Sequence, residues 1–269
     1  MIANNYAKGD ALAALYDQAV AAAQAAVASS PDLAEAHSAL GFALFNGRLD
    51  AAAATAPYAR SFELGFGNAD ILSAFANFSG RAGNFADARK AIARAQRLDP
   101  LNAVVFRNAG VIEYSARDYA ACQAPLRSAL TINPDLAGVH LVLGDVHLIA
   151  GRNAEARAEY LQEGTTLSRQ RGLAIADWRL GNRAAAEAGL AAMIARYGDN
   201  SLYQQAQVRA QWGQAEAALA ALEKALSAGD SGLVQSRNDP LLDPLRKESR
   251  FTAILRQLGF ERPGIPAGT

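Results

Sequence analysis

The residues of this chain best suited to metal binding or nucleophilic chemistry are three histidines and one cysteine. His140 and His147 are seven residues apart and share one helical face, but a metal site needs further ligands at a recognisable spacing, and the sequence offers none. His37 and His140 occupy positions where a bulky packing residue is expected, and histidine is often partly buried. We therefore expect packing roles for these two histidines and no bound metal.

The single cysteine, Cys122, stands at a position for a small, buried residue. A catalytic dyad would need a partner histidine, which the helical pattern around Cys122 does not obviously supply. The motifs GxxxxGK[ST], GxSxG and HExxH are absent from the sequence. The glycine-containing stretches 63–67 and 80–83 follow predicted helices rather than strands, so they do not predict a phosphate-binding loop. These observations favour a non-enzymatic protein without a cofactor.

Charge limits the classes of partner. Lys plus Arg and Asp plus Glu both number 26, so the formal net charge is zero, and no basic run is present to bind nucleic acid or an anionic membrane surface. No apolar run approaches the ~20 residues of a transmembrane helix. The N-terminal stretch, in which Lys8 is the only positive charge, does not resemble a signal peptide. A lone cysteine suits a reducing compartment, so we predict a cytoplasmic protein.

Two helical patterns recur along the chain with a period close to 34 residues, as between Pro100 and Pro134. A small residue early in each second helix sets the register, and a glycine or an arginine marks the preceding turn. The small residues are Ala52, Ala88, Cys122, Ala156, Ala186 and Ala218, and the turn residues are Gly47, Gly83, Arg117, Gly151, Gly181 and Gly213. The small residues follow one another at spacings of 36, 34, 34, 30 and 32. This register predicts a series of antiparallel helical hairpins.

The pattern resembles the tetratricopeptide repeat (TPR) family, whose units run from a bulky residue and Leu-Gly through a turn glycine to a closing proline. One unit matches through Phe106, Ala109-Gly110, Cys122, Leu126, Ala129 and Pro134, and the next through His140, Leu143-Gly144, Gly151, Ala156 and Tyr160. The resemblance covers roughly residues 11–230, although the last two units lack the closing proline. It implies an all-α fold, a right-handed TPR-like superhelix of helical hairpins.

We divide the chain into a repeat array over residues 1–230, with about six hairpins and an N-terminal partial unit, and a C-terminal capping helix and tail over residues 231–269. In the tail, Phe251, Ile254, Leu255 and Leu258 recur at helical spacing as one apolar stripe. Such a stripe is suited to cover the open end of a solenoid.

The tail, together with Ala195-Arg196-Tyr197-Gly198, resembles the C-terminal TPR segment of bacterial multidomain signalling proteins. In those proteins the segment follows a winged-helix DNA-binding domain, a class III nucleotide cyclase domain or a protein kinase domain. The resemblance implies a docking or sensory arm rather than the enzyme itself.

In the TPR family the first helix of each unit lines a concave groove, which implies a site for a protein or a peptide. The residues mapped to this groove are Ser73, Asn77, Arg81, Arg107, Asn108, Tyr114, Leu141, Asp145, Arg171, Trp178 and Tyr203. They include the arginine and aromatic types that are enriched at interface hot spots. We expect Arg107, Tyr114, Arg171 and Trp178 to face one concavity.

Other interpretations stay open. The Lys/Asn/Lys/Arg clamp by which some TPR proteins hold a C-terminal carboxylate is matched only by Asn77 and Asn108, which disfavours that ligand. The chain could instead be a homodimerisation element or a structural spacer. An enzyme with a site built in the groove is the third possibility, to be recognised by a nucleophile and a base within hydrogen-bond reach.

Overall fold

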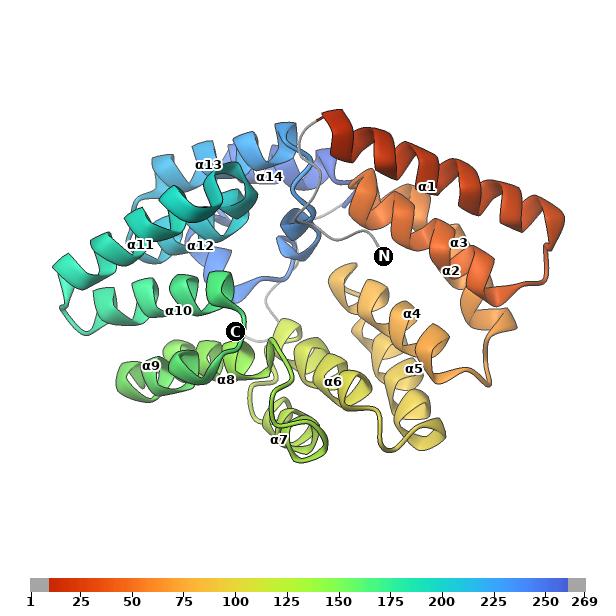
Figure 1. The fold of residues 1–269 in the computed structure, drawn as a ribbon, viewed down its shortest axis with the longest axis horizontal. Helices are drawn as coiled ribbons and strands as arrows, with labels where there is room; N and C mark the ends of the chain where they lie inside the picture. Colours follow the sequence, from red (N-terminus) through yellow and green to blue (C-terminus); the bar gives the residue numbers. More distant parts are fainter. Residues whose placement is uncertain (1–9, 261–269) are drawn as a thin grey trace.

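The computed structural model describes residues 10–260, and in that part of the chain it contains fourteen α-helices and no strand (Figure 1). After α1 (Asp10–Ser29) the helices pair into antiparallel hairpins. The pairs are α2 (Ala34–Phe42) with α3 (Ala51–Leu64), α4 (Ala69–Arg81) with α5 (Phe85–Leu98), α6 (Ala103–Ser115) with α7 (Gln123–Ile132), α8 (Val139–Ile149) with α9 (Asn153–Gln162), α10 (Thr166–Arg179) with α11 (Arg183–Tyr197), and α12 (Leu202–Gln211) with α13 (Ala215–Ser227). The last helix is α14 (Ser249–Gln257). The predicted all-α superhelix of hairpins is therefore confirmed.

The second helix of most hairpins buries its fourth residue completely. These residues are Ala88, Ala156, Ala186 and Ala218. Only a small side chain fits there, because the two helices of a hairpin approach closely at this level. Cys122 is also fully buried, although it directly precedes α7.

The predicted register of the first hairpin is wrong. Ala52 is exposed, and Ala54, 34 residues before Ala88, is the buried residue. The carboxylate of Asp50 accepts a hydrogen bond from the backbone N–H of Ala53 at 2.9 Å and caps α3. The helix therefore begins at Ala51 and has Ala54 as its fourth residue, which a run of four alanines conceals in the sequence.

Five of the six predicted turn residues adopt the left-handed conformation. Gly83, Gly151, Gly181 and Gly213 have φ of 87°, 75°, 86° and 78°, and Arg117 has φ of 68°. The predicted turn near Gly47 is also present, but there Leu49 takes the left-handed conformation, with φ of 55°. Gly47 is the last residue of a π-helical segment, Ala43–Gly47. A Cβ added at Gly47 would collide with the ring of Tyr16.

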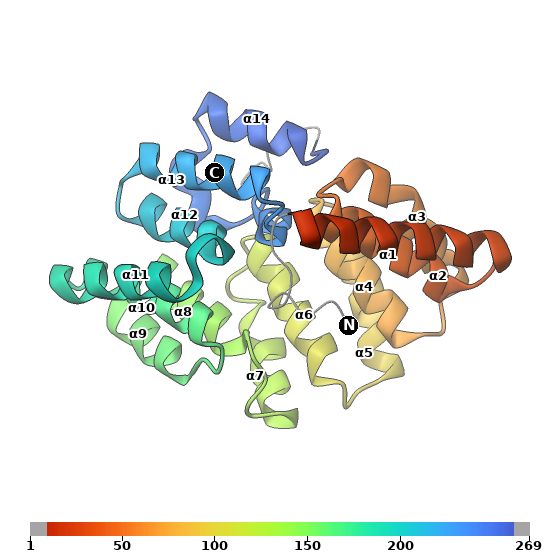
Figure 2. The ribbon, with the colours of Figure 1, turned by 45° about the horizontal axis from the view of Figure 1, so that its top comes forward.

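The array curves round until its two ends meet at the C-terminal segment. Figures 1 and 2 show α14 beside α13, and the C-terminal end of α14 lies close to α3. The backbone N–H of Ala51, at the start of α3, donates to the carbonyl of Leu258 at 3.0 Å. The ring of Phe260 meets that of Phe45 edge to face, with centroids 6.3 Å apart. The described chain is thus a superhelix of hairpins whose two ends are joined into a closed ring by the C-terminal segment.

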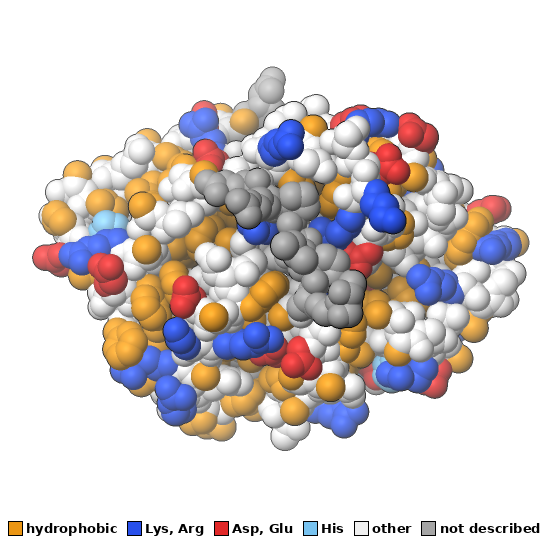
Figure 3. All heavy atoms as spheres, turned by 180° about the vertical axis from the view of Figure 1, so that it is seen from behind, with side chains coloured by type: hydrophobic (Ala, Val, Ile, Leu, Met, Phe, Trp, Pro, Cys, Tyr) orange, Lys and Arg blue, Asp and Glu red, His pale blue; other side chains and the backbone are white. Residues whose placement is uncertain are grey.

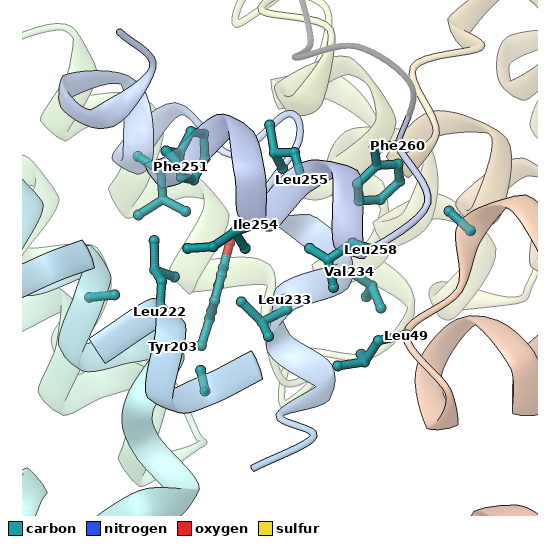
Figure 4. Packing of buried hydrophobic residues seen from close by; sticks show 14 of the residues in the cluster. Leu49, Tyr203, Leu222, Leu233, Val234, Phe251, Ile254, Leu255, Leu258 and Phe260 are labelled. Atoms are coloured by element: carbon teal, nitrogen blue, oxygen red, sulfur yellow. The ribbon is translucent and has the colours of Figure 1, made fainter. Parts of the chain in front are cut away.

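One apolar cluster spans this junction. The stripe predicted for the tail lies on α14 and on Leu258 directly after it, and it is buried: Phe251, Ile254, Leu255 and Leu258 are each at most 2 % exposed. Figure 4 shows these side chains packed between Leu222 and Tyr203 of the last hairpin and Leu49 of the first. The tail therefore packs against both the last hairpin and the first.

Between α13 and α14 the chain passes along the concave side of the ring through the 3-10 helices η3 (Ser231–Gln235) and η4 (Pro240–Leu245). The side-chain amide of Asn238 donates to the carbonyls of Gly80 and Arg81 of α4, both at 3.0 Å. Asp243 accepts from Arg117, which follows α6 in the neighbouring hairpin, at 2.7 Å. This segment therefore partly fills the concave groove predicted along the first helices.

None of the helices within residues 10–260 combines the length and the apolar character needed to cross a membrane. The face in Figure 3 carries basic and acidic side chains interspersed with apolar ones.

Candidate functional site

A cavity of about 260 Å³ remains between the first helices of five hairpins and the segment that crosses the concave side. Most of the predicted groove residues line it: Asn77, Arg81, Arg107, Asn108, Tyr114, Leu141, Asp145, Arg171 and Tyr203. These side chains come from α4, α6, α8, α10 and α12, so the repeat brings together residues far apart in the sequence. The tail adds Gln235, Asn238 and Asp239, which the sequence did not predict as site residues.

Asp145 is the centre of a buried polar network on one wall of the cavity. Arg171 contacts it through two hydrogen bonds, from Nη1 to Oδ1 at 2.8 Å and from Nη2 to Oδ2 at 3.1 Å. The hydroxyl of Tyr160 donates to Oδ1 at 2.6 Å, and that of Tyr114 donates to Oδ2 at 3.4 Å. Burial opposes the charged form of Arg171, but the adjacent carboxylate outweighs this and raises the pKa of the guanidinium. The pair ties α8 to α10.

Asp239 forms a second network at the point where the tail crosses the cavity. Its Oδ2 accepts from the hydroxyl of Tyr203 and from Nε2 of Gln207, each at 2.6 Å. Its Oδ1 accepts from the backbone N–H of Leu241 at 2.9 Å and so caps η4. An Asp before Pro is a sequence signal for a cap, but that signal does not reveal that the carboxylate lies against α12.

Arg81 and Arg107 differ from Arg171, because no carboxylate contacts them within the described residues. The Nε atom of Arg81 is buried and has no hydrogen-bond partner. Arg107 donates to two neutral oxygens, the carbonyl of Ala137 and Oδ1 of Asn108, each at 3.3 Å. Burial lowers the pKa of both guanidinium groups, and Arg107 lowers that of Arg81 further by charge repulsion.

Comparison with known proteins gives fold-level similarity. No protein-family model matches the chain, and no curated protein does. Among solved structures, a tetratricopeptide repeat protein from Parabacteroides merdae is 15 % identical with a TM-score of 0.61, and the match covers 90 % of this chain and 92 % of that one. PilF of Pseudomonas aeruginosa is 19 % identical with a TM-score of 0.53, over 68 % of this chain and 85 % of that one. Cut9, in the APC/C hetero-tetramer Cut9–Hcn1, is 15 % identical with a TM-score of 0.60, over 92 % of this chain and 48 % of that one.

The chain has the TPR fold. At these identities the similarity shows the fold alone, and the chemistry of the cavity has to be argued from this chain's own residues.

Two of the predicted groove residues, Ser73 and Trp178, do not line the cavity. Ser73 is buried and accepts a hydrogen bond from Nδ2 of Asn108 at 3.0 Å. It therefore positions a side chain that lines the cavity without lining it itself. Trp178 stacks on Trp212 with ring centroids 4.5 Å apart, and the guanidinium of Arg183 lies 3.5 Å from its ring centroid. Arg107, Tyr114 and Arg171 therefore share the cavity, whereas the partly buried Trp178 pairs with the buried Trp212 outside it.

Two of the histidines are hydrogen-bonded to neighbouring side chains, and the cysteine is buried. Nδ1 of His140 is 2.7 Å from Oε2 of Glu159, and Nδ1 of His147 is 2.9 Å from Nε of Arg152. Cys122 is buried, and burial raises the pKa of its thiol to about 11. Within residues 10–260 no cluster of three or more His, Cys, Asp or Glu side chains is placed to hold a metal ion.

Proposed function

We propose that this chain is a non-enzymatic scaffold that binds a protein partner through a peptide segment entering the central cavity. The observation that carries this proposal is the convergence of side chains from the first helices of five hairpins on one cavity. The cavity combines aromatic, arginine and amide groups, which suit a peptide with its alternating apolar and polar contacts. Cut9, which is similar to this chain in fold only, is found in a hetero-tetramer with a separate protein, Hcn1.

The occupied groove favours an extended peptide over a helix. An α-helix with its side chains is about 10 Å across. A helix laid along the concave face would have to displace the tail, which is held there by Asn238, Asp239 and Asp243. An extended segment needs only the opening that the cavity provides.

A non-enzymatic role is supported by what the carboxylates of the cavity do. Asp145 accepts hydrogen bonds from Arg171, Tyr160 and Tyr114, and Asp239 accepts from Tyr203 and Gln207. Both carboxylates therefore link helices, a use that engages their lone pairs in structure rather than in proton transfer.

The proposal extends to the wider setting suggested by the tail. We place the chain as a docking or sensory arm of a bacterial signalling protein in the cytoplasm, with a protein or peptide as partner and without nucleic acid or membrane. The balanced charge of the chain, 26 basic and 26 acidic residues, supports the last two points.

The test is a selection of short displayed peptides against the whole chain. We expect binders in the micromolar range whose affinity falls by about tenfold or more in an Asn77→Ala, Leu141→Ala double variant. Both side chains line the cavity and are only partly buried, so their truncation costs little stability. Arg127, exposed on α7, gives the matched control Arg127→Ala. Peptides that bind the double variant as tightly as the wild type would refute the cavity as the partner site.

Homodimerisation is the second candidate, and one observation favours it. Leu98, Leu101 and Val104, around the connection from α5 to α6, are 44 %, 78 % and 42 % exposed. Adjacent exposed apolar side chains of this size often mark an interface. Light scattering across a concentration series separates the two candidates, because a scaffold keeps the monomer mass of 28.3 kDa while a dimer doubles it.

A further inference from the structure

The charges that line the cavity do not balance. Three arginines, Arg81, Arg107 and Arg171, face it together with two aspartates, Asp145 and Asp239. Arg171 is paired with Asp145 through two hydrogen bonds. Asp239 is held by the neutral donors of Tyr203, Gln207 and the backbone of Leu241. The guanidinium groups of Arg81 and Arg107 are left without a carboxylate in contact among the described residues.

The carboxylate of Glu163 attracts Arg107 from a greater distance, but it is engaged elsewhere. It accepts hydrogen bonds from the backbone N–H groups of Gly138, Leu141 and Thr165 at 3.0 to 3.1 Å. Glu163 is 1 % exposed, so it caps the start of α8 from within the protein. The hydrogen bonds of the Arg107 guanidinium go instead to the neutral oxygens of Ala137 and Asn108.

Two like charges placed together out of bulk water oppose folding unless a counter-charge joins them. Burial and mutual repulsion disfavour the charged form of Arg81. Its Nε remains a buried donor without an acceptor. The Oε1 atom of Gln204, which lines the same cavity, is likewise buried without a donor. Unsatisfied groups gathered in one cavity are a usual sign of a binding site, because a ligand can satisfy them together.

We propose that Arg81 and Arg107, with Gln204 beside them, form a binding site for a dianionic oxyanion of the size of a phosphate group. Two guanidinium groups supply the positive charge and the paired N–H donors that phosphate oxygens accept. The Oε1 atom of Gln204 is an acceptor, which suits the single hydroxyl of hydrogen phosphate. The site goes beyond the scaffold function and does not depend on it.

The direct test is calorimetric titration of the whole chain with inorganic phosphate in chloride buffer of matched ionic strength. We expect saturable binding of one phosphate per chain and a melting temperature that rises with phosphate concentration. Acetate at the same ionic strength should bind at least tenfold more weakly, because it is a monoanion. Phosphate that produces no more heat and no more stabilisation than chloride, or no more than acetate, would overturn the proposal.

Variants assign the binding to the two arginines. Arg81→Met with Arg107→Met should abolish the phosphate-dependent shift, and Arg107→Gln alone should weaken binding at least tenfold. In phosphate-free buffer the double variant should melt at or above the wild-type temperature, because a repulsion is removed. The control is Arg127→Met on the exposed surface of α7, which should bind phosphate as the wild type does. Phosphate binding that survives in Arg107→Gln, or a large loss of stability in the double variant, would show that the arginines are structural.

A second arm identifies the source of the oxyanion. O-phosphoserine that competes with inorganic phosphate in the wild type, and not in Arg107→Gln, would indicate a site open to a phosphate ester on a larger molecule. Competition by neither serine nor phosphoserine, with phosphate still bound, would indicate a site for the free anion. Failure of phosphate in all arms refutes the oxyanion site, while peptide selection at Asn77 and Leu141 still tests the scaffold separately.

Discussion

At the scale of single residues, the ion pair of Asp145 and Arg171 joins α8 to α10 at the wall of the cavity. Both side chains are almost wholly buried, at 6 % and 3 % exposure, so neither can exchange its partner for water. Removing one member would leave the other charge buried and uncompensated.

We therefore expect Arg171→Ala to lower the free energy of unfolding by about 3–5 kcal/mol. The control is Lys224→Ala, which breaks an ion pair with Asp199 in which both side chains are about 60 % exposed. An exposed pair of this kind contributes about 0–1 kcal/mol. Urea denaturation followed by circular dichroism measures both values, and equal losses would contradict the importance assigned to burial.

Cys122 supports a prediction about reactivity. Its thiol is fully buried, and burial raises its pKa to about 11, so almost no thiolate exists near neutral pH. Iodoacetamide should leave the folded protein unlabelled at pH 8 and should label it rapidly once urea unfolds it. Rapid labelling of a protein that keeps its native circular dichroism spectrum would contradict this buried position.

The sequence could predict which residues of the candidate site face inward, because the repeat fixes which face of each first helix lies on the concave side. Arg107, Tyr114 and Arg171 fall on that face and line the cavity. Trp178 falls on the same face by its spacing but stacks on Trp212, 34 residues later, and under Arg183. Spacing within one helix cannot anticipate a side chain that turns toward a neighbouring hairpin.

At the scale of elements, α14 is the helix whose role can be tested most directly. Phe251 is fully buried in the cluster that joins the last hairpin to the first. We expect Phe251→Ala to cost about 3–5 kcal/mol, and the melting temperature to fall by roughly 10 °C. Lys247→Ala, at an exposed position just before α14, should leave it nearly unchanged.

A chain ending at Asp230 extends this test, because it lacks η3, η4 and α14 altogether. It should melt below the full chain and expose apolar surface to a dye such as ANS. If it melts at the same temperature and stays soluble, the tail does not stabilise the array and instead serves a partner.

The helices could be predicted because their apolar residues recur within a window of a few turns. The path of the tail could not, since its defining contacts are remote in sequence. Asn238 binds the carbonyl of Gly80 across a separation of 158 residues, and Arg117 binds Asp243 across 126. A repeat pattern describes neighbours along the array and contains no information on a segment that crosses it.

At the scale of the whole molecule, closure of the ring is the property that distinguishes this chain from an open superhelix. The seam between the ends runs through Gly259, which has φ of 74°. A Cβ at this position would lie 2.8 Å from the backbone nitrogen of Ala52 and 3.1 Å from that of Ala51. The tail can approach α3 closely only because residue 259 is glycine, and the hydrogen bond from Ala51 to Leu258 depends on that approach.

Substitution at this glycine therefore tests whether the ring closes in solution. Gly259→Ala should lose about 1–2 kcal/mol of stability, because alanine disfavours the left-handed backbone. It should also separate the tail from α3 and break the hydrogen bond from Ala51 to Leu258. Gly229→Ala is the matched control, because Gly229 has a similar φ of 68° but nothing within 4 Å of an added Cβ. It should suffer the backbone penalty alone. Hydrogen exchange at the amide of Ala51 should accelerate only in Gly259→Ala, and small-angle scattering should show a larger radius of gyration for that variant. If both variants exchange at Ala51 and scatter alike, the seam does not hold the ends of the array together.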